Sequence, residues 1–580
     1  MEDLFVQLVD QALAIQRKGD FASAERIYKE VISLYPNHAQ PYRFLGLLYF
    51  QQRKYTESIP LLESACRLAP ADQWAHYSLG TSYVWSGMPE HAIGAFDQCL
   101  KLNSDFHRAR FARTMAHIPM IYTSQSEIAF WREGYAASLR SLADFYSIAS
   151  LDQRREAANV IGINQTYNLA YQACDDRKLQ EVYGQLICSL MATRYPHYCK
   201  ELEMPEDSED GRLRIGVLSA FFREHSNWKM PLQGWVENLD RKRFHVTCYC
   251  TSAEVDSCTL RAKHSCDHFV QGLSSIEEWA DRILRDRLHV LVNPGLGMDT
   301  LIAKLACLRL APIQCNGVGH PVTSGCETMD YYLSSDLMEP IDSAAHYSEE
   351  LVKLTNLGIH YSPASHPTTN LTREAFGVGA QAMVYCCCQT LYKYLPCYDS
   401  VFPRIAQQVP NAVFLFIKHR SDHVTQTFAK RLDLVFRNHG IDWKNHCVIL
   451  PRLSSADFNG LLAHSQVFLD PLDWNGMNTV MEAIHFGIPV VTLPGKYMRG
   501  RHAQAILRMI DVSETIALSE EHYVQLACQL GTDSTWRQRI QEKILAQKNR
   551  AYADMSAIAS LQQFLEDSVR RFRNIKNQIG

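Results

Sequence analysis

The chain has 580 residues, too many for one hydrophobic core, so we expect three or four domains. Its net charge of −4 does not supply the basic face that nucleic acids and anionic membranes require, and we expect neither as a partner. No apolar run approaches the roughly 20 residues that span a bilayer. The start of the chain also has no basic segment and no hydrophobic core of a secretory signal, so we expect neither a membrane span nor a signal peptide.

Eighteen cysteines are scattered along the chain. None forms a Cys-x-x-Cys pair, and no Cys/His spacing suits zinc. Several lie inside strand-like runs, at Cys248, Cys250 and 386–388, where cysteine acts as a small apolar residue. We therefore expect a reduced, cytoplasmic protein without a metal site.

The first hundred residues contain an internal repeat of 34 residues. Small residues at two of its positions would let paired helices approach closely, and stacking would bury faces that one unit cannot bury alone. The repeating positions are Ala12, Gly46 and Gly80; Ala24, Ser58 and Ala92; and Tyr28, Leu62 and Phe96. This pattern resembles tetratricopeptide repeats and predicts three of them over residues 1–106. Such an array presents a concave face to a peptide or partner protein; the alternative is a purely structural cap.

Residues 107–210 keep helical spacing but lose the repeat, which predicts a helical connector. Ser124 to Glu127 resembles a capped helix start. The acidic, turn-rich segment from Pro205 to Gly211 is the predicted domain boundary.

After Gly211 short apolar strands alternate with helical segments, which predicts parallel, doubly wound sheets. Two such sets predict two Rossmann-like halves, residues 211–378 and 379–545, with a cleft between them. The long charged helical stretch near the end, including a separate helix at 546–580, is expected to pack back across the first half. The predicted strands are 213–218, 245–250 and 289–293 in the first set, and 383–385, 412–417, 448–450, 467–469 and 490–493 in the second.

Two polar turns follow strands of the second half, at Gln389–Lys393 and Asn475–Glu482, and the second opens a helix. A lysine, backbone amides and a helix N-terminus in this setting can hold a diphosphate. The Asp-x-Asp pair that holds a metal in many glycosyltransferases is absent from the sequence. The turns therefore predict a metal-independent site for a nucleotide-diphosphate sugar.

The run from 212 to 530 resembles family-41 glycosyltransferases, the group of the protein O-GlcNAc transferase. The resemblance implies a tetratricopeptide-repeat α-solenoid followed by a GT-B fold of two Rossmann-like domains. It also implies inverting transfer of a sugar from a UDP-sugar, with UDP-GlcNAc as the first choice, onto Ser or Thr of an acceptor protein. The matching pieces are 213–219, 222–226, 311–314, 319–325, 329–331, 389–393, 409–411, 469–470, 475–482 and 487–495.

Five residues of the second half take donor-binding roles by this resemblance. Gln389 matches a donor-binding glutamine, and Lys393 matches the lysine that neutralises the phosphates. Thr479 matches a threonine on the diphosphate, while Asn478 replaces a neighbouring threonine. Glu482 takes the place of an aspartate that holds the ribose hydroxyls.

Five further residues complete the expected site. His225, at the exit of the first strand, is a candidate base or orienting group. Gly476 belongs to the diphosphate turn, Phe458 is a candidate for stacking on the base, and Arg501 adds positive charge near the cleft. His320 stands where O-GlcNAc transferases usually have tyrosine.

Departures from the family pattern leave alternatives open. The motif from Gly319 to Pro321 is similar to bacterial N-glucosyltransferases, which suggests UDP-glucose and an Asn acceptor. Plant O-fucosyltransferases share the His-Ser pair and the glutamate at Glu482, which suggests GDP-fucose. Met477 and Ser455 break the pattern where base and sugar are read, and Ala220 follows the serine where animal relatives carry an aspartate. A repeat scaffold with an inactive transferase domain is the remaining alternative, and the oligomeric state is left open.

Overall fold

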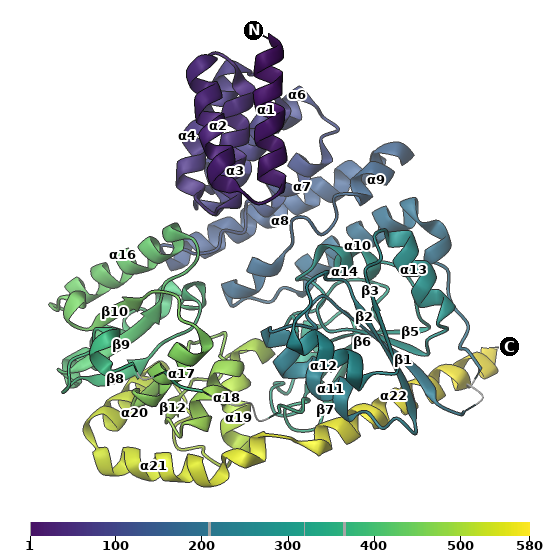
Figure 1. Cartoon of the computed structure of the whole chain (residues 1–580). Helices are drawn as coiled ribbons and strands as arrows, with labels where there is room; N and C mark the ends of the chain where they lie inside the picture. The colour runs from purple at the N-terminus through teal and green to yellow at the C-terminus, as the bar shows by residue number, and fades with distance from the viewer. Residues whose placement is uncertain (1, 207–209, 318, 363–366, 370, 580) are drawn as a thin grey trace. The chain divides into compact units, whose positions relative to one another are not determined.

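The structure is a computed structural model that describes residues 2–206, 210–317, 319–362, 367–369 and 371–579. The chain forms two compact units, Met1–Ile148 with His419–Ala429, and Ala149–Lys418 with Lys430–Gly580. Figure 1 labels their helices and strands. Part of the predicted acidic linker, 207–209, lies outside the described residues. Within the described ranges, no helix has the length and apolar content needed to cross a membrane.

The first unit is helical, as the repeat predicts. Each repeat is a pair of helices, and the first helix of each pair is followed by a left-handed residue at Gly19, Arg53 or Gly87 (φ 85°, 63° and 70°). These three residues are themselves 34 apart, so the period extends to the turns. The helices are α1 (Glu2–Arg17), α2 (Phe21–Leu34), α3 (Ala39–Gln51), α4 (Tyr55–Leu68), α5 (Gln73–Trp85) and α6 (Pro89–Leu102), followed by α7 (His107–Met115) and α8 (Gln125–Ile148).

Close contact between paired helices explains the small residues of the repeat. A Cβ added at Gly46 would lie 2.7 Å from Leu62 Cγ, and one at Gly80 would lie 2.6 Å from Phe96 Cε1. Larger side chains there would force the pairs apart, at a cost of about 1–3 kcal/mol each. The predicted tetratricopeptide architecture is confirmed.

The predicted connector is divided between the two units. Its first part forms α7 and α8, and the predicted cap at the start of α8 is present, since Ser124 Oγ accepts a hydrogen bond from the Glu127 N–H at 3.3 Å. Its later part, with α9 (Leu151–Ala158), a 3₁₀ helix (Tyr167–Gln172) and α10 (Arg177–Arg194), belongs to the second unit.

The second unit contains two parallel sheets. The first has seven strands in the order β3-β2-β1-β4-β5-β6-β7. Predicted strands 213–218, 245–250 and 289–293 correspond to β1, β2 and β4. The strands are β1 (Leu213–Ser219), β2 (Phe244–Cys250), β3 (His268–Gln271), β4 (Val290–Asn293), β5 (Ile313–Gly317), β6 (Tyr331–Ser335) and β7 (Glu350–Leu354); the helices are α11 (Gln233–Asn238), α12 (Ser257–Ser265), α13 (Ile276–Arg285) and α14 (Thr300–Leu305).

The remaining strands of this sheet carry weaker signals. In β5, Gln314 and Asn316 are fully buried, so the strand does not read as an apolar run. The Gln314 side chain donates to the carbonyls of Leu308 and Thr328, both at 2.9 Å, which satisfies it inside the core.

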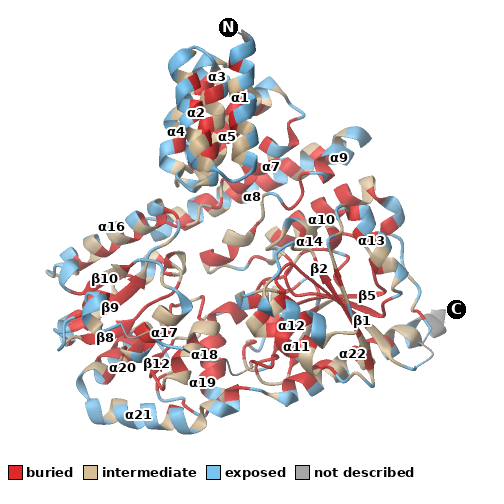
Figure 2. Cartoon of the chain, viewed as in Figure 1, coloured by how far each residue is buried: buried red, intermediate tan, exposed pale blue. Residues whose placement is uncertain are grey.

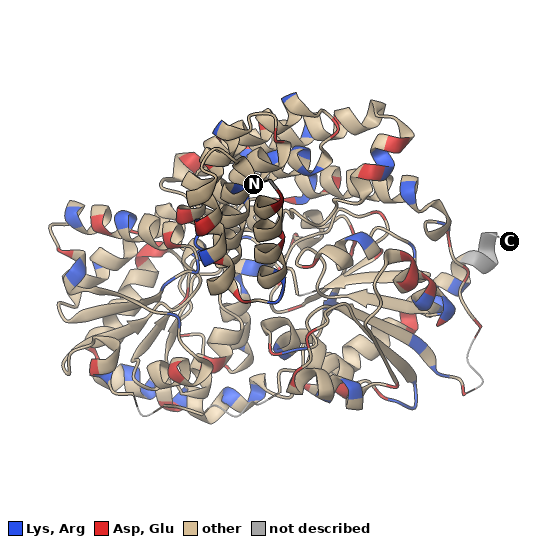
Figure 3. Ribbon diagram, turned by 45° about the horizontal axis from the view of Figure 1, so that its top comes forward, with Lys and Arg blue, Asp and Glu red and all other residues tan. Residues whose placement is uncertain are grey.

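The second sheet has five strands in the order β10-β9-β8-β11-β12, and all five coincide with predicted ones. Figure 2 shows the strands of both sheets as largely buried, and Figure 3 shows charge of both signs mixed over the helices. The strands are β8 (Met383–Cys386), β9 (Ala412–Ile417), β10 (Cys447–Leu450), β11 (Val467–Leu469) and β12 (Val490–Val491); the helices are α15 (Val401–Gln408), α16 (Asp422–Asn438), α17 (Ser455–Ala463), α18 (Asn478–His485), α19 (His502–Met509), α20 (Glu520–Thr532) and α21 (Ser534–Gln547).

The last helix, α22 (Met555–Ile579), packs across the first sheet, as expected. The Phe564 ring meets Tyr331 edge-on at 5.2 Å. Ion pairs join Glu566 to Arg243 at 2.6 Å and Arg571 to Glu350 at 2.7 Å. The end of the chain therefore ties the two sheets into one unit.

Candidate functional site

A cavity of about 1060 Å³ lies between the two sheets of the second unit. It is lined by turns that follow β1, β4 and β5 of the first sheet and β8 and β11 of the second. These are carboxyl ends of parallel strands, where ligands bind in such folds. Five of the predicted site residues line it: His225, Gln389, Lys393, Asn478 and Thr479.

Lys393 lies in the cavity wall at the end of a 3₁₀ turn after β8. Its Nζ donates to Gln389 Oε1 at 2.9 Å and to the Asn475 carbonyl at 3.2 Å. An ammonium group has three donors, so these two bonds leave one for a ligand. Burial lowers the pKa of Lys393 to about 8, against an opposing effect of Asp470. The lysine is therefore mostly charged at neutral pH, and a bound anion would raise its pKa again.

The turn before α18 is held by Asp470 at the end of β11. This carboxylate accepts the Gly476 N–H at 2.7 Å and the Thr492 hydroxyl at 2.9 Å. A Cβ on Gly476 would lie 2.3 Å from Thr479 Oγ1 and 2.7 Å from Gln389 Nε2, so the turn needs glycine. Burial raises the pKa of Asp470 to about 7, while its two donors and Lys393 favour the carboxylate.

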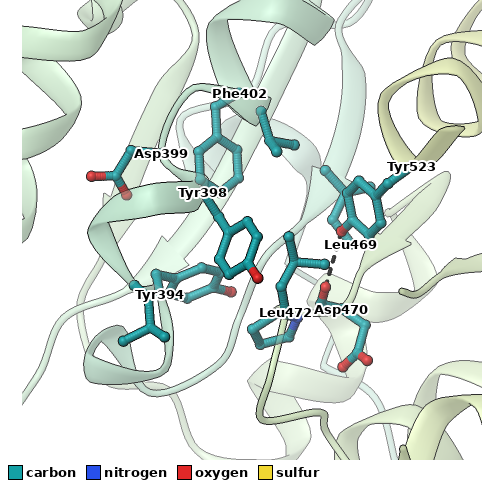
Figure 4. Close-up of a pocket in the computed structure, with 11 residues that line it drawn as sticks. Tyr394, Tyr398, Asp399, Phe402, Leu469, Asp470, Leu472 and Tyr523 are labelled. Atoms are coloured by element: carbon teal, nitrogen blue, oxygen red, sulfur yellow. Dashed lines mark hydrogen bonds between the residues drawn. The ribbon is translucent and has the colours of Figure 1, made fainter. Parts of the chain in front are cut away.

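An aromatic cluster supports this turn from behind. Figure 4 shows Tyr394, Tyr398, Phe402 and Tyr523 around a smaller pocket of about 350 Å³ beside Asp470. Tyr523 donates its hydroxyl to the Asp470 carbonyl at 3.0 Å. Rigid backing of this kind keeps the polar turn in place before a ligand arrives.

The N-terminus of α18 opens into the cavity. Met477 precedes the helix and gives no side-chain cap, so the first-turn amides keep their hydrogen-bonding capacity. Gln389 Nε2 donates to Thr479 Oγ1, which joins the two polar turns predicted from the sequence. Asn478 Oδ1 is buried and meets no hydrogen-bond partner within the described part of the chain. The lysine, the amides and the hydroxyl therefore line one side of the cavity with groups of the kind that can hold an anion.

His225 comes from the opposite sheet, after β1. Its ring stacks on Phe221 at 4.3 Å, and its Nδ1 accepts the Asn227 N–H at 3.1 Å. Burial lowers the pKa of His225 to about 4, with a further contribution from Arg223. A backbone N–H can only donate, so the neutral ring must carry its proton on Nε2. His225 therefore presents a hydrogen-bond donor in this arrangement.

The other predicted residues do not line the cavity. Gly476 shapes the turn, as described. Glu482 lies farther along α18, near the 2.7 Å ion pair between Lys229 and Glu224 of the first half. Burial raises the pKa of Glu482 to about 7; Glu224 adds to this rise, and Lys229 opposes it. Phe458 is half-buried in α17. These positions leave the predicted roles of Glu482 and Phe458 untested.

Arg501 and His320 have other surroundings. Arg501 Nε donates to the Met338 carbonyl at 3.0 Å and its Nη1 to the Gly495 carbonyl at 3.2 Å, so its guanidinium bridges two loops. His320 is buried against the Tyr167 ring at 5.2 Å and borders a second cavity of about 420 Å³. Burial lowers the pKa of His320 to about 4, with Arg499 adding to the effect.

The connector supplies a wall of the cavity that the sequence did not predict. Tyr171 stacks on Trp474 with centroids 3.9 Å apart and planes at 9°. Tyr171 also donates its hydroxyl to Tyr167 at 3.0 Å. Trp474 directly precedes the polar turn and could have been suspected from that position, whereas the two tyrosines lie in a stretch without a periodic pattern.

Arg499 holds this aromatic segment against the second half. Its Nε donates to the Ala170 carbonyl at 2.9 Å, and its Nη2 donates to the Cys174 carbonyl at 2.7 Å and to Asp176 at 3.2 Å. Both side chains of the Arg499–Asp176 pair are almost fully buried. The Arg499 guanidinium therefore forms an internal salt bridge.

Comparisons with known proteins agree with this architecture. The sequence matches the profile described as glycosyl transferase family 41 over residues 187–360 and 364–563, and a tetratricopeptide-repeat profile over 9–73. The SPINDLY protein of Arabidopsis thaliana, named a probable UDP-N-acetylglucosamine–peptide N-acetylglucosaminyltransferase, is 25% identical over 338 residues, 56% of this chain and 35% of that protein. The SEC protein of the same plant, with the same descriptive name, is 24% identical over 380 residues, 62% of this chain and 38% of that protein. The chain thus spans about a third of the length of these curated relatives.

A solved structure is similar over almost the whole chain. A point mutant of the Thermobaculum terrenum O-GlcNAc transferase superposes with a TM-score of 0.69 at 22% identity, covering 99% of this chain and 98% of that one. The likeness establishes the expected fold, repeats followed by a GT-B arrangement of two parallel-sheet domains.

Proposed function

The chain belongs to glycosyl transferase family 41, and on that premise we propose that it transfers a sugar from a nucleotide diphosphate to a protein side chain. The leading assignment is GlcNAc from UDP-GlcNAc onto Ser or Thr. The observation that carries the proposal is the wall formed by Lys393, Gln389, Thr479 and the α18 N-terminus, which we call the diphosphate wall and which lies at the carboxyl ends of β8 and β11.

The chemical task of such a site is to stabilise the leaving diphosphate. Lys393 supplies a positive charge in a partly water-excluded cavity, where electrostatic stabilisation is stronger than in water. The first-turn amides of α18 and the Thr479 hydroxyl add donors along the same wall. In this proposal these groups take the role of a metal ion, and the acceptor attacks from the opposite face of the sugar, which inverts the anomeric centre.

His225 has a different role in the proposal from a general base. His225 lines the cavity from the first sheet, and its low pKa keeps the ring neutral at physiological pH, with Nε2–H as the available donor. A neutral donor can orient a sugar or acceptor oxygen without competing for the proton that the acceptor loses. We assign His225 as an orienting donor.

Glu482 and Phe458 do not line the cavity, and in this proposal they contact the nucleoside of the donor. Glu482 projects from the same helix as Thr479, one turn later, where a carboxylate can accept both ribose hydroxyls. Phe458, on α17 after β10, is proposed to stack on the base. The tyrosine pair and Trp474 form an aromatic wall suited to the acceptor side of the cavity.

The repeats and the cysteines complete the proposal. The tetratricopeptide array is proposed to present the acceptor protein or a partner. All eighteen cysteines are free thiols, which suits a reducing compartment such as the cytoplasm.

A binding panel tests the donor. UDP-GlcNAc, UDP-glucose and GDP-fucose are compared by thermal shift, since a ligand that binds only the folded chain raises its melting temperature. Transfer is then followed by mass spectrometry of acceptor peptides containing Ser, Thr or Asn. The expected result is a shift with UDP-GlcNAc and a mass gain of one GlcNAc on Ser or Thr. Glucose on Asn, or fucose, would replace the leading assignment, and no shift with any donor would favour an inactive scaffold.

A further inference from the structure

Three buried cysteines from distant parts of the sequence meet in the second unit. Cys188 lies on α10, Cys307 follows α14, and Cys326 lies in the loop between β5 and β6. Their Sγ atoms all lie within 4.8 Å of one another. The transferase reaction proposed above uses none of them.

Close backbone contact brings Cys188 and Cys326 together. A Cβ on Gly184, one helical turn before Cys188, would lie 2.1 Å from the Gly325 carbonyl oxygen. Gly325 has φ of 70°, and a Cβ there would lie 1.9 Å from the Gln180 carbonyl oxygen. Helix α10 and the loop therefore touch through two glycines, one a helical turn before Cys188 and the other next to Cys326, and this packing positions the two sulfurs.

The spacing suits a single thiophilic ion. Zn–S bonds of about 2.3 Å place ligand sulfurs roughly 3.8 Å apart in a tetrahedral site. Small rotations of the three side chains would bring sulfurs that lie within 4.8 Å to that separation.

A cavity adjoins the cluster. The cavity of about 420 Å³ that borders His320 also borders Cys326 and Ile187. Two of its buried atoms, His320 Nε2 and Asn316 Nδ2, have no hydrogen-bond partner among the residues that the structure describes. Such groups hold ordered water, and a water beside Cys326 can fill the fourth position of a three-thiolate ion.

We propose that Cys188, Cys307 and Cys326 bind one Zn²⁺ ion, with a water from the adjacent cavity as fourth ligand. Each thiol loses its proton on binding, so one Zn²⁺ and three thiols give a complex of net charge −1 and three released protons. The ion would join two segments beside the cavity of about 1060 Å³. One is α10, which follows Tyr167 and Tyr171, and the other is the loop whose Gly319 and Pro321 line that cavity. The site lies apart from the diphosphate wall.

The test measures metal content and metal spectroscopy on the full chain. Protein purified under reducing conditions is depleted with a chelator and titrated anaerobically with Zn²⁺, and then with Co²⁺ as a coloured probe. We expect one tight equivalent per chain, a thiolate-to-cobalt charge-transfer band with tetrahedral d–d bands, and a higher melting temperature with Zn²⁺. The site is expected to be lost in Cys188→Ser and in Cys326→Ser.

The control is Cys447→Ser, which changes a buried cysteine of the second sheet and should keep the equivalent. If the cluster variants fail to fold, alkylation of the wild-type cysteines is compared with and without Zn²⁺. Zn²⁺ should protect Cys188, Cys307 and Cys326 from alkylation and leave the labelling of Cys447 unchanged. Absence of a tight equivalent in the wild type would overturn the proposal. So would a tight equivalent retained by a folded variant that lacks all three thiols. Donor binding by thermal shift is measured in parallel, so that failure of the zinc site is distinguished from failure of the proposed transferase function.

Discussion

Replacing Lys393 by methionine removes the charge of the proposed diphosphate wall while keeping the length and packing of the side chain. In the structure two of the three N–H donors of Lys393 are taken by Gln389 and Asn475, and the third is available to the ligand. The substitution should therefore remove one charge-assisted contact that strengthens as the diphosphate leaves.

The expected loss follows from the strength of such contacts. Removing one preorganised donor from a developing oxyanion costs about 3 kcal/mol, or roughly 100- to 1000-fold in kcat. The melting temperature should change by only a few degrees, because the variant no longer buries an ammonium group. Asp470, whose pKa is already raised to about 7, can become neutral when its cation is gone.

The assay measures kcat for sugar transfer and hydrolysis of the donor, together with the dissociation constant of UDP. Lys496→Ala is the matched control, since Lys496 is an exposed lysine of the same half. If Lys393→Met keeps full activity with the donor that stabilises the wild type, the assignment of the diphosphate wall is wrong. A loss of the same size in Lys496→Ala would point to a general charge effect.

Four further outcomes are expected. UDP affinity should fall as pH rises through about 8, because the free lysine loses its proton there and binding needs the charged form; calorimetry from pH 7 to 9.5 should find this dependence absent in Lys393→Met. Glu482→Gln should weaken UDP binding and yet stabilise the unliganded protein above pH 7 by about 2 kcal/mol in urea unfolding. Folding raises the pKa of Glu482 from 4.5 to about 7, so the native state binds the extra proton and the stability of the wild type falls as pH rises through that range. The partial exposure of this side chain reduces the size of the effect. His225→Gln should keep kcat within about tenfold, while His225→Ala should lose roughly 100-fold; equal losses would favour a general base. Asp176→Asn should destabilise the chain by about 3 kcal/mol in urea unfolding, because it leaves the Arg499 charge buried without its carboxylate.

Local patterns in the sequence were sufficient for most of the fold. The 34-residue period identified the helix pairs because the same crossing must be made in each repeat, at Gly46 against Leu62 and at Gly80 against Phe96. All five strands of the second sheet were found because parallel strands covered on both faces are almost wholly apolar. Strand β5 was not predicted because its buried Gln314 interrupts the apolar run, and the loop carbonyls of Leu308 and Thr328 that satisfy this side chain are placed only by the fold.

The candidate site divides in the same way. Gln389, Lys393, Asn478 and Thr479 were predictable because each follows a strand end, and parallel strand ends meet at one edge of a sheet. The protonated nitrogen of His225 was not predictable from the sequence, because it depends on a hydrogen bond from the backbone N–H of Asn227. The place of Tyr171 in the cavity wall was not predictable either, because Tyr171 stacks on Trp474, which lies about three hundred residues later in the chain.

The sequence by itself determined the repeats, the two sheets and the polar turns, since each depends on the spacing of residues that are neighbours along the chain. Only the tertiary structure decided the aromatic wall, the Arg499–Asp176 pair and the meeting of Cys188, Cys307 and Cys326. The cysteines show the reason most clearly: no spacing between them suggests a metal site, and the glycine contact that brings Cys188 and Cys326 together joins α10 to a loop more than a hundred residues away.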